Sequence, residues 1–194
     1  MAKKILLAAV VVIAVLVAVI AAQPSAYRVE RSAAIAAPPD VVYAQIADFH
    51  RWAAWSPWAK ADPAMKTTYA GAPAGKGAVC DWSGNDRVGA GTMTIFAAEP
   101  GERLEIQLQF RKPWSSVSST EFALRPAAGG TRVTWIMSGA NDFAGKAFSL
   151  VASIDKMFGK DFEQGLQSLG AVAEAEARKG ATLVPSAAPP PTDR

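Results

Sequence analysis

Polar and apolar residues alternate through six short segments between residues 65 and 138, and this pattern restricts the chain to folds that contain an antiparallel sheet. Glycine, proline and asparagine separate the segments, and such short turns join strands that are neighbours in the sheet. In the clearest segment, 103–110, every second residue is apolar: Leu104, Ile106, Leu108 and Phe110. The sequence therefore predicts a sheet with one buried face.

A helical pattern follows these strands, from Phe143 to Arg178. Its apolar residues recur at steps of three and four, which places them on one face of a helix: Leu150, Ile154, Met157, Phe158, Phe162, Leu166, Leu169 and Val172. Asn141 and Asp142 can accept hydrogen bonds at its start, and Gly180 suits its end. We expect one long helix to cover the buried face of the sheet, which gives an α+β domain.

The chain begins with an apolar run that is long enough to cross a bilayer. Ile5 to Ala22 contains 18 uncharged apolar residues, and Lys3 and Lys4 precede it. We predict a transmembrane anchor whose N-terminus stays in the cytoplasm, with the rest of the chain on the periplasmic or extracellular side of the inner membrane. A cleaved signal sequence is the alternative, because small residues and Gln23-Pro24 follow the run.

The remaining segments complete the predicted organisation. Residues 1–4 form a cytoplasmic stub and 23–26 a linker, followed by one domain over 27–179 that opens with a strand and a short helix. The segment 180–194 is rich in proline and alanine without periodicity, which predicts a disordered tail.

Charge and cysteine content exclude several classes of site. The 20 basic residues nearly balance the 17 acidic ones and form no basic stripe, so we expect no nucleic-acid partner. A single cysteine, Cys80, excludes an intrachain disulfide and a cysteine-based metal cluster. The sequence carries no signal for a particular oligomeric state.

Five stretches in this order resemble the SRPBCC, or START-like, superfamily, and more narrowly its polyketide cyclase/dehydrase branch. They are residues 31–43, 52–58, 82–85, 88–93 and 130–135. The resemblance implies a helix-grip fold, in which a curved antiparallel sheet wraps around the C-terminal helix and encloses an apolar cavity. The bound molecule differs between branches of this superfamily, so the fold does not identify it.

Residues capable of catalysis are few. His50 is the only histidine, and no helix N-terminus or basic neighbour is predicted to activate Cys80. The glycines at 89–91 lie between strands and lack the lysine of a phosphate-binding loop. Strand alternation places Glu105 and Glu121 on the solvated face of the sheet. We predict no catalytic residue, no metal ligand and no cofactor, and leave open whether the protein is an enzyme.

The cavity between sheet and helix is the predicted binding site. Glycines interrupt the long helix at Gly159 and Gly165, which costs helix stability and favours a cavity, and methionines provide adaptable walls. The alternative is a filled core, with the tryptophans of 52–58 serving as a plug. The predicted lining residues are Trp55, Trp58, Trp82, Met93, Ile106, Leu108, Trp135, Met137, Ile154, Met157, Phe158 and Phe162.

These observations favour a membrane-tethered protein that binds a lipid-like or aromatic hydrophobic small molecule. A membrane anchor allows such a pocket to sample apolar molecules from the bilayer. Two alternatives remain: an enzyme of the polyketide cyclase or dehydratase type, and an envelope interaction domain without a ligand.

Overall fold

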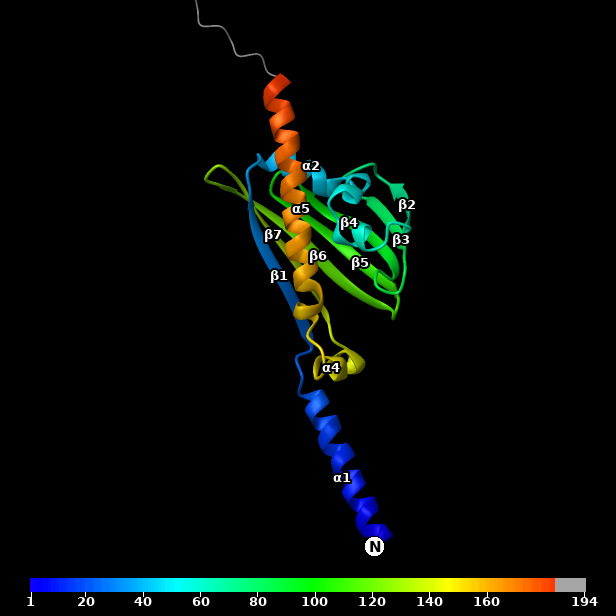
Figure 1. Cartoon of the computed structure of the whole chain (residues 1–194). Helices are drawn as coiled ribbons and strands as arrows, with labels where there is room; N and C mark the ends of the chain where they lie inside the picture. The colour runs from blue at the N-terminus through cyan, green and yellow to red at the C-terminus, as the bar shows by residue number, and fades with distance from the viewer. Residues whose placement is uncertain (184–194) are drawn as a thin grey trace, which may run out of the picture.

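The computed structural model describes residues 1–183, and the predicted tail beyond Leu183 lies outside the described residues. An N-terminal helix is followed by a strand, three short helical segments, six strands and two helices (Figure 1). Their bounds are α1 (Ala2–Ala21), β1 (Ala26–Ile35), α2 (Pro39–Ala47), η1 (Phe49–Ala54), α3 (Pro57–Ala61), β2 (Lys66–Gly71), β3 (Ala78–Ser83), β4 (Ala90–Glu99), β5 (Arg103–Lys112), β6 (Ser116–Ala127), β7 (Gly130–Ala140), α4 (Phe143–Ser149) and α5 (Ile154–Leu183).

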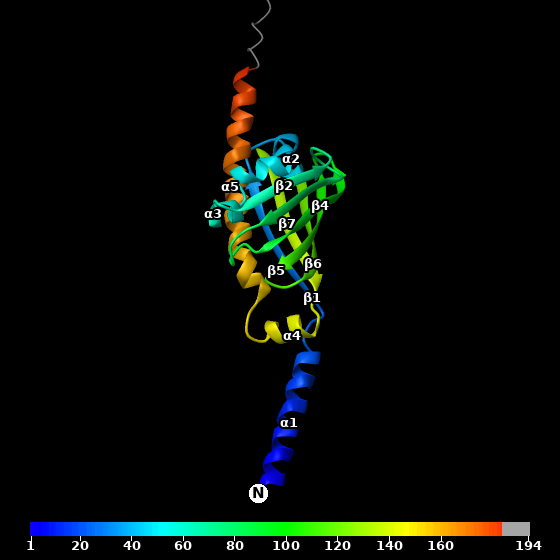
Figure 2. The same ribbon diagram turned by 90° about the vertical axis from the view of Figure 1, so that its right-hand side faces the viewer.

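All seven strands form one antiparallel sheet with the order β1-β7-β6-β5-β4-β3-β2. Strands β2 to β7 follow one another as a meander, and β1 joins at the far edge by pairing with β7, with Val29 opposite Met137. The sheet is curved, and α5 runs along its concave side (Figure 2). The predicted α+β helix-grip fold is therefore confirmed.

The expectation of one unbroken helix from Phe143 was wrong. The chain instead forms α4 and then α5, because each helix has its own start. Asp142 accepts a hydrogen bond from the Gly145 N–H at 2.7 Å, and the Ser153 hydroxyl accepts one from the Lys156 N–H at 3.4 Å. Leu150, between the two helices, is 41% exposed instead of buried. Helix α5 also passes Gly180 and ends at Leu183, so the predicted end was too early.

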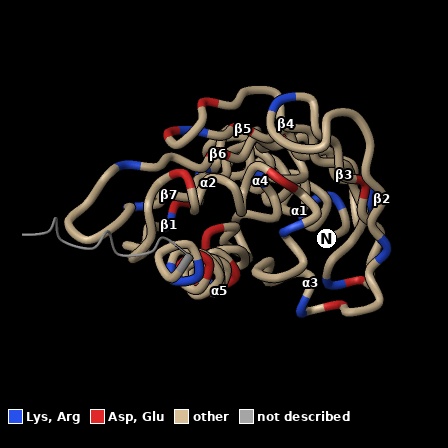
Figure 3. Tube along the Cα trace, turned by 90° about the horizontal axis from the view of Figure 1, so that it is seen from above, with Lys and Arg blue, Asp and Glu red and all other residues tan. Residues whose placement is uncertain are grey.

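Helix α5 packs on β1 and β7 at one side of the sheet and does not lie over its centre (Figure 3). Two glycines bring it close to its neighbours. The Arg31 guanidinium lies against Gly159 and pairs with Asp155 at 2.8 Å and Glu163 at 2.7 Å. A Cβ at Gly165 would be 2.7 Å from the Trp135 ring. These two glycines therefore allow α5 to pack closely on its neighbours. The cavity that the sequence analysis inferred from them does not border the helix at Gly159 or Gly165.

The tryptophan-rich stretch covers the middle of the concave face. Trp55 is fully buried, and its ring meets Phe122 and Trp135 edge-on at centroid distances of 6.1 Å and 5.8 Å. The indole N–H groups of Trp52 and Trp55 donate to the carbonyls of Ile46 and Gln45 at the end of α2. Trp55 is thus packed into the core as the plug alternative expected, whereas Trp52 and Trp58 also line the cavity described below.

Helix α1 extends away from the domain (Figures 1 and 2). Its 20 residues are long and apolar enough to cross a membrane, a test that a signal sequence also passes. Helix α1 contacts α4, and the Lys146 Nζ donates to the Ala21 carbonyl at 3.1 Å. Asn141 donates to the Pro24 carbonyl at 3.2 Å. The end of α1 is thus bonded to one end of the domain.

Candidate functional site

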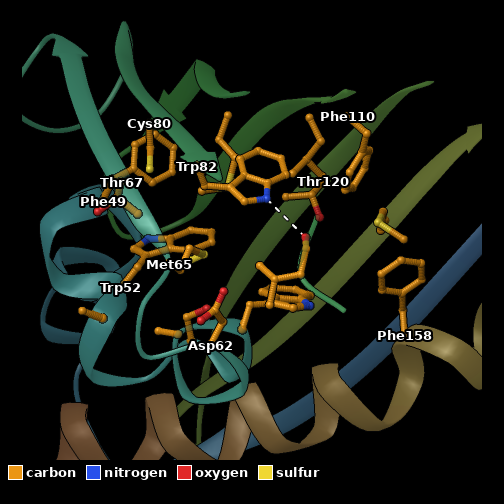
Figure 4. A pocket seen from close by; sticks show the side chains of 18 of the residues that line it. Phe49, Trp52, Asp62, Met65, Thr67, Cys80, Trp82, Phe110, Thr120 and Phe158 are labelled. Atoms are coloured by element: carbon orange, nitrogen blue, oxygen red, sulfur yellow. Dashed lines mark hydrogen bonds between the residues drawn. The ribbon is translucent and has the colours of Figure 1, made fainter. Parts of the chain in front are cut away.

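A cavity of about 390 Å³ lies between the concave face of β2 to β7, the η1–α3 stretch and the first turns of α5 (Figure 4). Its lining is predominantly aromatic and aliphatic. The cavity exists because α5 covers β1 and β7, while only short helical segments cover the opposite half of the sheet.

The sheet side of the cavity is built from cross-strand neighbours. The register places Cys80 opposite Met93 and Met93 opposite Leu108, so these side chains form one row across β3, β4 and β5. In the next row Trp82 lies across Gly91 and meets Phe110 edge-on at 5.6 Å. Any side chain at Gly91 would overlap the Trp82 ring. Alternation along three strands therefore produces one continuous apolar wall.

The opposite wall is aromatic. The ring of Trp135 stacks on Phe162 at 4.1 Å with an interplanar angle of 12°, and Trp58 meets Trp135 edge-on at 5.7 Å. Helix α5 supplies Phe162 and Phe158, one turn apart, from the first half of its buried face. This side of the cavity is thus formed by aromatic rings that pack against one another.

Two polar groups of the cavity wall, the Thr120 hydroxyl and the Asp62 carboxylate, already have partners in the protein. The Thr120 hydroxyl donates to the Ile136 carbonyl at 2.7 Å and accepts from the Trp135 indole N–H at 3.2 Å. Asp62 accepts from the backbone N–H groups of Asn85 at 2.7 Å and Ala64 at 3.1 Å. A molecule in this cavity would therefore be held mainly by apolar contact.

Eight of the twelve residues predicted from the sequence line this cavity: Trp58, Trp82, Met93, Leu108, Trp135, Met137, Phe158 and Phe162. Trp55 and Ile106 do not, because both are completely buried in the hydrophobic core. Met157 is 45% exposed, since the turn of α5 that directs Phe158 inward directs Met157 outward. Ile154 packs against the edge of the core outside the cavity.

Fourteen lining residues were not predicted. Three of these had a signal in the sequence, because Cys80, Phe110 and Thr120 lie two residues from apolar positions on the same strand face. The others come mostly from the irregular chain between α2 and β2, where the spacing of the residues does not indicate which side chains point into the cavity. The fourteen are Phe49, Trp52, Ala53, Ser56, Ala59, Asp62, Pro63, Met65, Thr67, Tyr69, Cys80, Val88, Phe110 and Thr120.

The strand carboxylates face away from the cavity. Arg103 forms ion pairs with Glu105 and Glu121 on the convex face. Arg111 and the Thr92 hydroxyl donate to Asp81, and these bonds lower the pKa of that carboxyl below its usual range. Within residues 1–183 no group of three or more His, Cys, Asp and Glu side chains is arranged to hold a metal ion. These carboxylates link strands and carry no acid–base function in the cavity.

Cys80 lines the cavity as a protonated thiol. Burial, with a smaller contribution from the Asp81 charge, raises the pKa of Cys80 to about 11. Because the thiolate is the reactive form, we expect Ellman's reagent at about pH 8 to react roughly 100-fold more slowly with the folded chain than with the chain unfolded in urea. The rate of thionitrobenzoate release measures this difference. Equal rates in the two states would contradict the assignment.

Solved structures share this fold. Protein CV1439 from Chromobacterium violaceum aligns with a TM-score of 0.55 at 20% identity, over 78% of this chain and 99% of that one. Protein MLL2253 from Mesorhizobium loti gives 0.56 at 19% identity, over 77% and 98% of the two chains. The Aha1 dimer from Colwellia psychrerythraea gives 0.56 at 15% identity, over 76% and 96%. No curated protein matches the sequence.

The model of one protein family, described as polyketide cyclase / dehydrase and lipid transport, matches residues 26–174. The match begins at the first residue of β1, ends within α5 and includes every residue that lines the cavity. Helix α1 lies outside it. The predicted resemblance is confirmed: this chain belongs to the polyketide cyclase / dehydrase and lipid transport family of the SRPBCC superfamily.

Proposed function

We propose that the domain binds a hydrophobic small molecule, lipid-like or aromatic, in the cavity between the sheet and α5, while α1 holds it on a membrane. The observation that carries this proposal is a cavity of about 390 Å³ with predominantly apolar walls. Pockets for small molecules generally enclose about 300–1,000 Å³ and are lined mostly by apolar and aromatic side chains. The family description, which includes lipid transport, agrees with this class of ligand.

The chemistry of the walls favours binding over catalysis. Asp62 is the one carboxylate among the described lining residues, and two backbone N–H groups already occupy its oxygens. The Thr120 hydroxyl is similarly engaged with Ile136 and Trp135. A cyclase or dehydratase would need an acid or base directed at its substrate. Apolar burial needs no such group, and each Å² of apolar surface removed from water contributes about 25 cal/mol.

The tether rests on α1. Twenty helical residues extend about 30 Å, which matches the hydrocarbon thickness of a bilayer. Lys3 and Lys4 at its start favour a cytoplasmic N-terminus, which places the domain on the periplasmic or extracellular side. Such a domain would receive its apolar ligand from the membrane without carrying it through water.

Photolabelling tests the proposed binding. The full chain is reconstituted into lipid vesicles with a long-chain fatty acid that carries a diazirine, and labelled peptides are identified by mass spectrometry after illumination. We expect labels on β4 and β5 peptides that contain Met93 and Leu108. Replacing Leu108 by tryptophan fills the cavity and is expected to reduce labelling of the cavity peptides severalfold.

The control is Gln107→Trp, which adds the same side chain to the exposed convex face of the same strand. It is expected to leave labelling at the level of the wild type. Labels on α1 report contact with the bilayer and should be equal in all three proteins. Equal labelling of the cavity peptides in Leu108→Trp and wild type, or no labelling of these peptides in either, would refute binding in the cavity.

A further inference from the structure

Exposed apolar side chains concentrate at one end of the domain. Between the end of α1 and Leu183, the last described residue, eight large apolar side chains are exposed, and five of them belong to the β5–β6 turn, the start of β6, α4 and the α4–α5 connection. We call this set the apolar end. Its members are Trp114 (62% exposed), Val117 (58%), Phe143 (53%), Leu150 (41%) and Val151 (84%).

The register of the sheet places these segments together. Ala26, the first residue of β1, lies opposite Ala140, the last residue of β7. Ser118 of β6 lies opposite Gly139 of β7, so the β5–β6 turn is at the same end of the sheet. The Trp114 ring reaches Phe148 of α4 at a centroid distance of 6.0 Å. The apolar end is therefore one surface formed by segments distant in sequence.

This surface adjoins the end of α1. Figure 1 shows α4 directly beside the last turn of α1, and the bond from Lys146 to the Ala21 carbonyl joins the two helices. If the 20 residues of α1 fill the hydrocarbon core, Ala21 lies at its boundary. The apolar end then lies at the same depth, where the headgroups meet the acyl chains.

The composition of the apolar end suits lipid. Tryptophan and other aromatic residues are enriched at the boundary between hydrocarbon and water. Segments 111–117 and 142–153 contain one acidic residue, Asp142, which is engaged as the cap of α4. The same segments contain the basic residues Arg111, Lys112 and Lys146. Arg111 is paired with Asp81, and Lys112 and Lys146 leave a basic balance that anionic headgroups attract.

We propose that the apolar end lies in the headgroup region of the bilayer that α1 crosses, so that the domain is docked on the membrane as well as tethered to it. This inference rests on the tether in the proposed function. Docking fixes the orientation of the cavity. The side that faces the membrane is lined by Phe110, next to the β5–β6 turn, and by Phe158, in the first turns of α5 (Figure 4). Helix α5 then points away from the bilayer (Figure 1).

Depth-dependent quenching tests the docking. In a Cys80→Ala background the full chain carries one cysteine with a nitrobenzoxadiazole fluorophore, placed by Val151→Cys at the apolar end. The vesicles contain phosphatidylcholine and phosphatidylglycerol with a spin label near the head of the acyl chain. We expect severalfold stronger quenching at Val151→Cys than at the matched control Gln107→Cys, which lies on the convex face of β5. Both positions are exposed, so neither substitution disturbs the core.

A third label, Leu16→Cys in α1, separates this inference from the proposed tether. Quenching at Leu16→Cys with none at Val151→Cys would leave the tether in place and overturn the docking. An unquenched label at Leu16→Cys would overturn the tether and the docking with it. A Val151→Cys label that is shifted to the blue but unquenched by lipid, and that loses this shift on dilution into more vesicles, would show that a second copy of the chain covers the apolar end and would also overturn the docking.

Discussion

Replacing Trp135 by alanine is expected to lower the free energy of unfolding by about 3–5 kcal/mol. Its ring is 2% exposed and stacks on Phe162 at 4.1 Å, with Phe122 at 4.7 Å on another side. Its indole N–H also bonds to Thr120. Alanine would enlarge the existing cavity and remove the contacts that join β7 to α5. The loss is therefore large and affects both sides of the cavity.

Thermal unfolding of the full chain in mild detergent, followed by circular dichroism, measures this loss. A change of this size lowers the midpoint by on the order of 10 °C for a chain of this length. The matched control is Trp114→Ala, the same replacement at a ring that is 62% exposed, for which we expect a loss below about 1 kcal/mol. Equal midpoints for the two variants would show that Trp135 does not have the packing role described.

Alanine substitutions at two glycines of the same helix are expected to have opposite effects. At Gly165 a Cβ would be 2.7 Å from the Trp135 ring and 3.3 Å from the Pro57 ring, so the Trp135 ring, which stacks on Phe162, would have to shift. We expect Gly165→Ala to cost about 1–3 kcal/mol through overpacking, which outweighs the intrinsic preference of alanine for helices. At Gly180 nothing lies within 4 Å, so only that preference acts.

Gly180→Ala is therefore expected to stabilise the protein slightly, by up to about 1 kcal/mol. Both variants are compared with wild type by the same thermal measurement in the same detergent. If Gly165→Ala stabilises the protein as much as Gly180→Ala does, then α5 does not approach Trp135 as closely as described. A cavity-facing probe, such as the photolabelling of Leu108, would show in addition whether the displaced ring narrows the cavity.

Local pattern predicted the strands well. The predicted segment 103–110 begins at the first residue of β5 and lies within that strand, because alternation and turn residues are determined by a few neighbouring residues. The break between α4 and α5 was missed for the opposite reason. Residues 150–153 contain neither glycine nor proline, and the apolar spacing continues through them. The break depends on two helix caps and on a contact with α1. The spacing of apolar residues along a helix carries no information about either.

The site was predictable where it is built from the sheet. Alternation along β4 and β5 identifies Met93 and Leu108 as inward-facing, and they line the cavity. Alternation also selects Ile106, which is equally inward-facing but is fully buried in the core. Whether an inward position is covered or open depends on the irregular stretch 49–65, whose path follows from packing between distant residues. The sequence thus specifies the apolar face, and the tertiary structure decides which part of it stays unfilled.

The pairing of β1 with β7 determines the order in which the domain can assemble. Val29 follows α1 closely, whereas its partner Met137 is 108 residues later in the chain. Closing a loop of that length costs about 4 kcal/mol in chain entropy before any contact compensates for it. During synthesis β1 therefore emerges first and stays unpaired until β7 follows, while the β2–β7 meander can form from neighbouring segments. Any chaperone that binds this chain during synthesis would have to protect that one early strand.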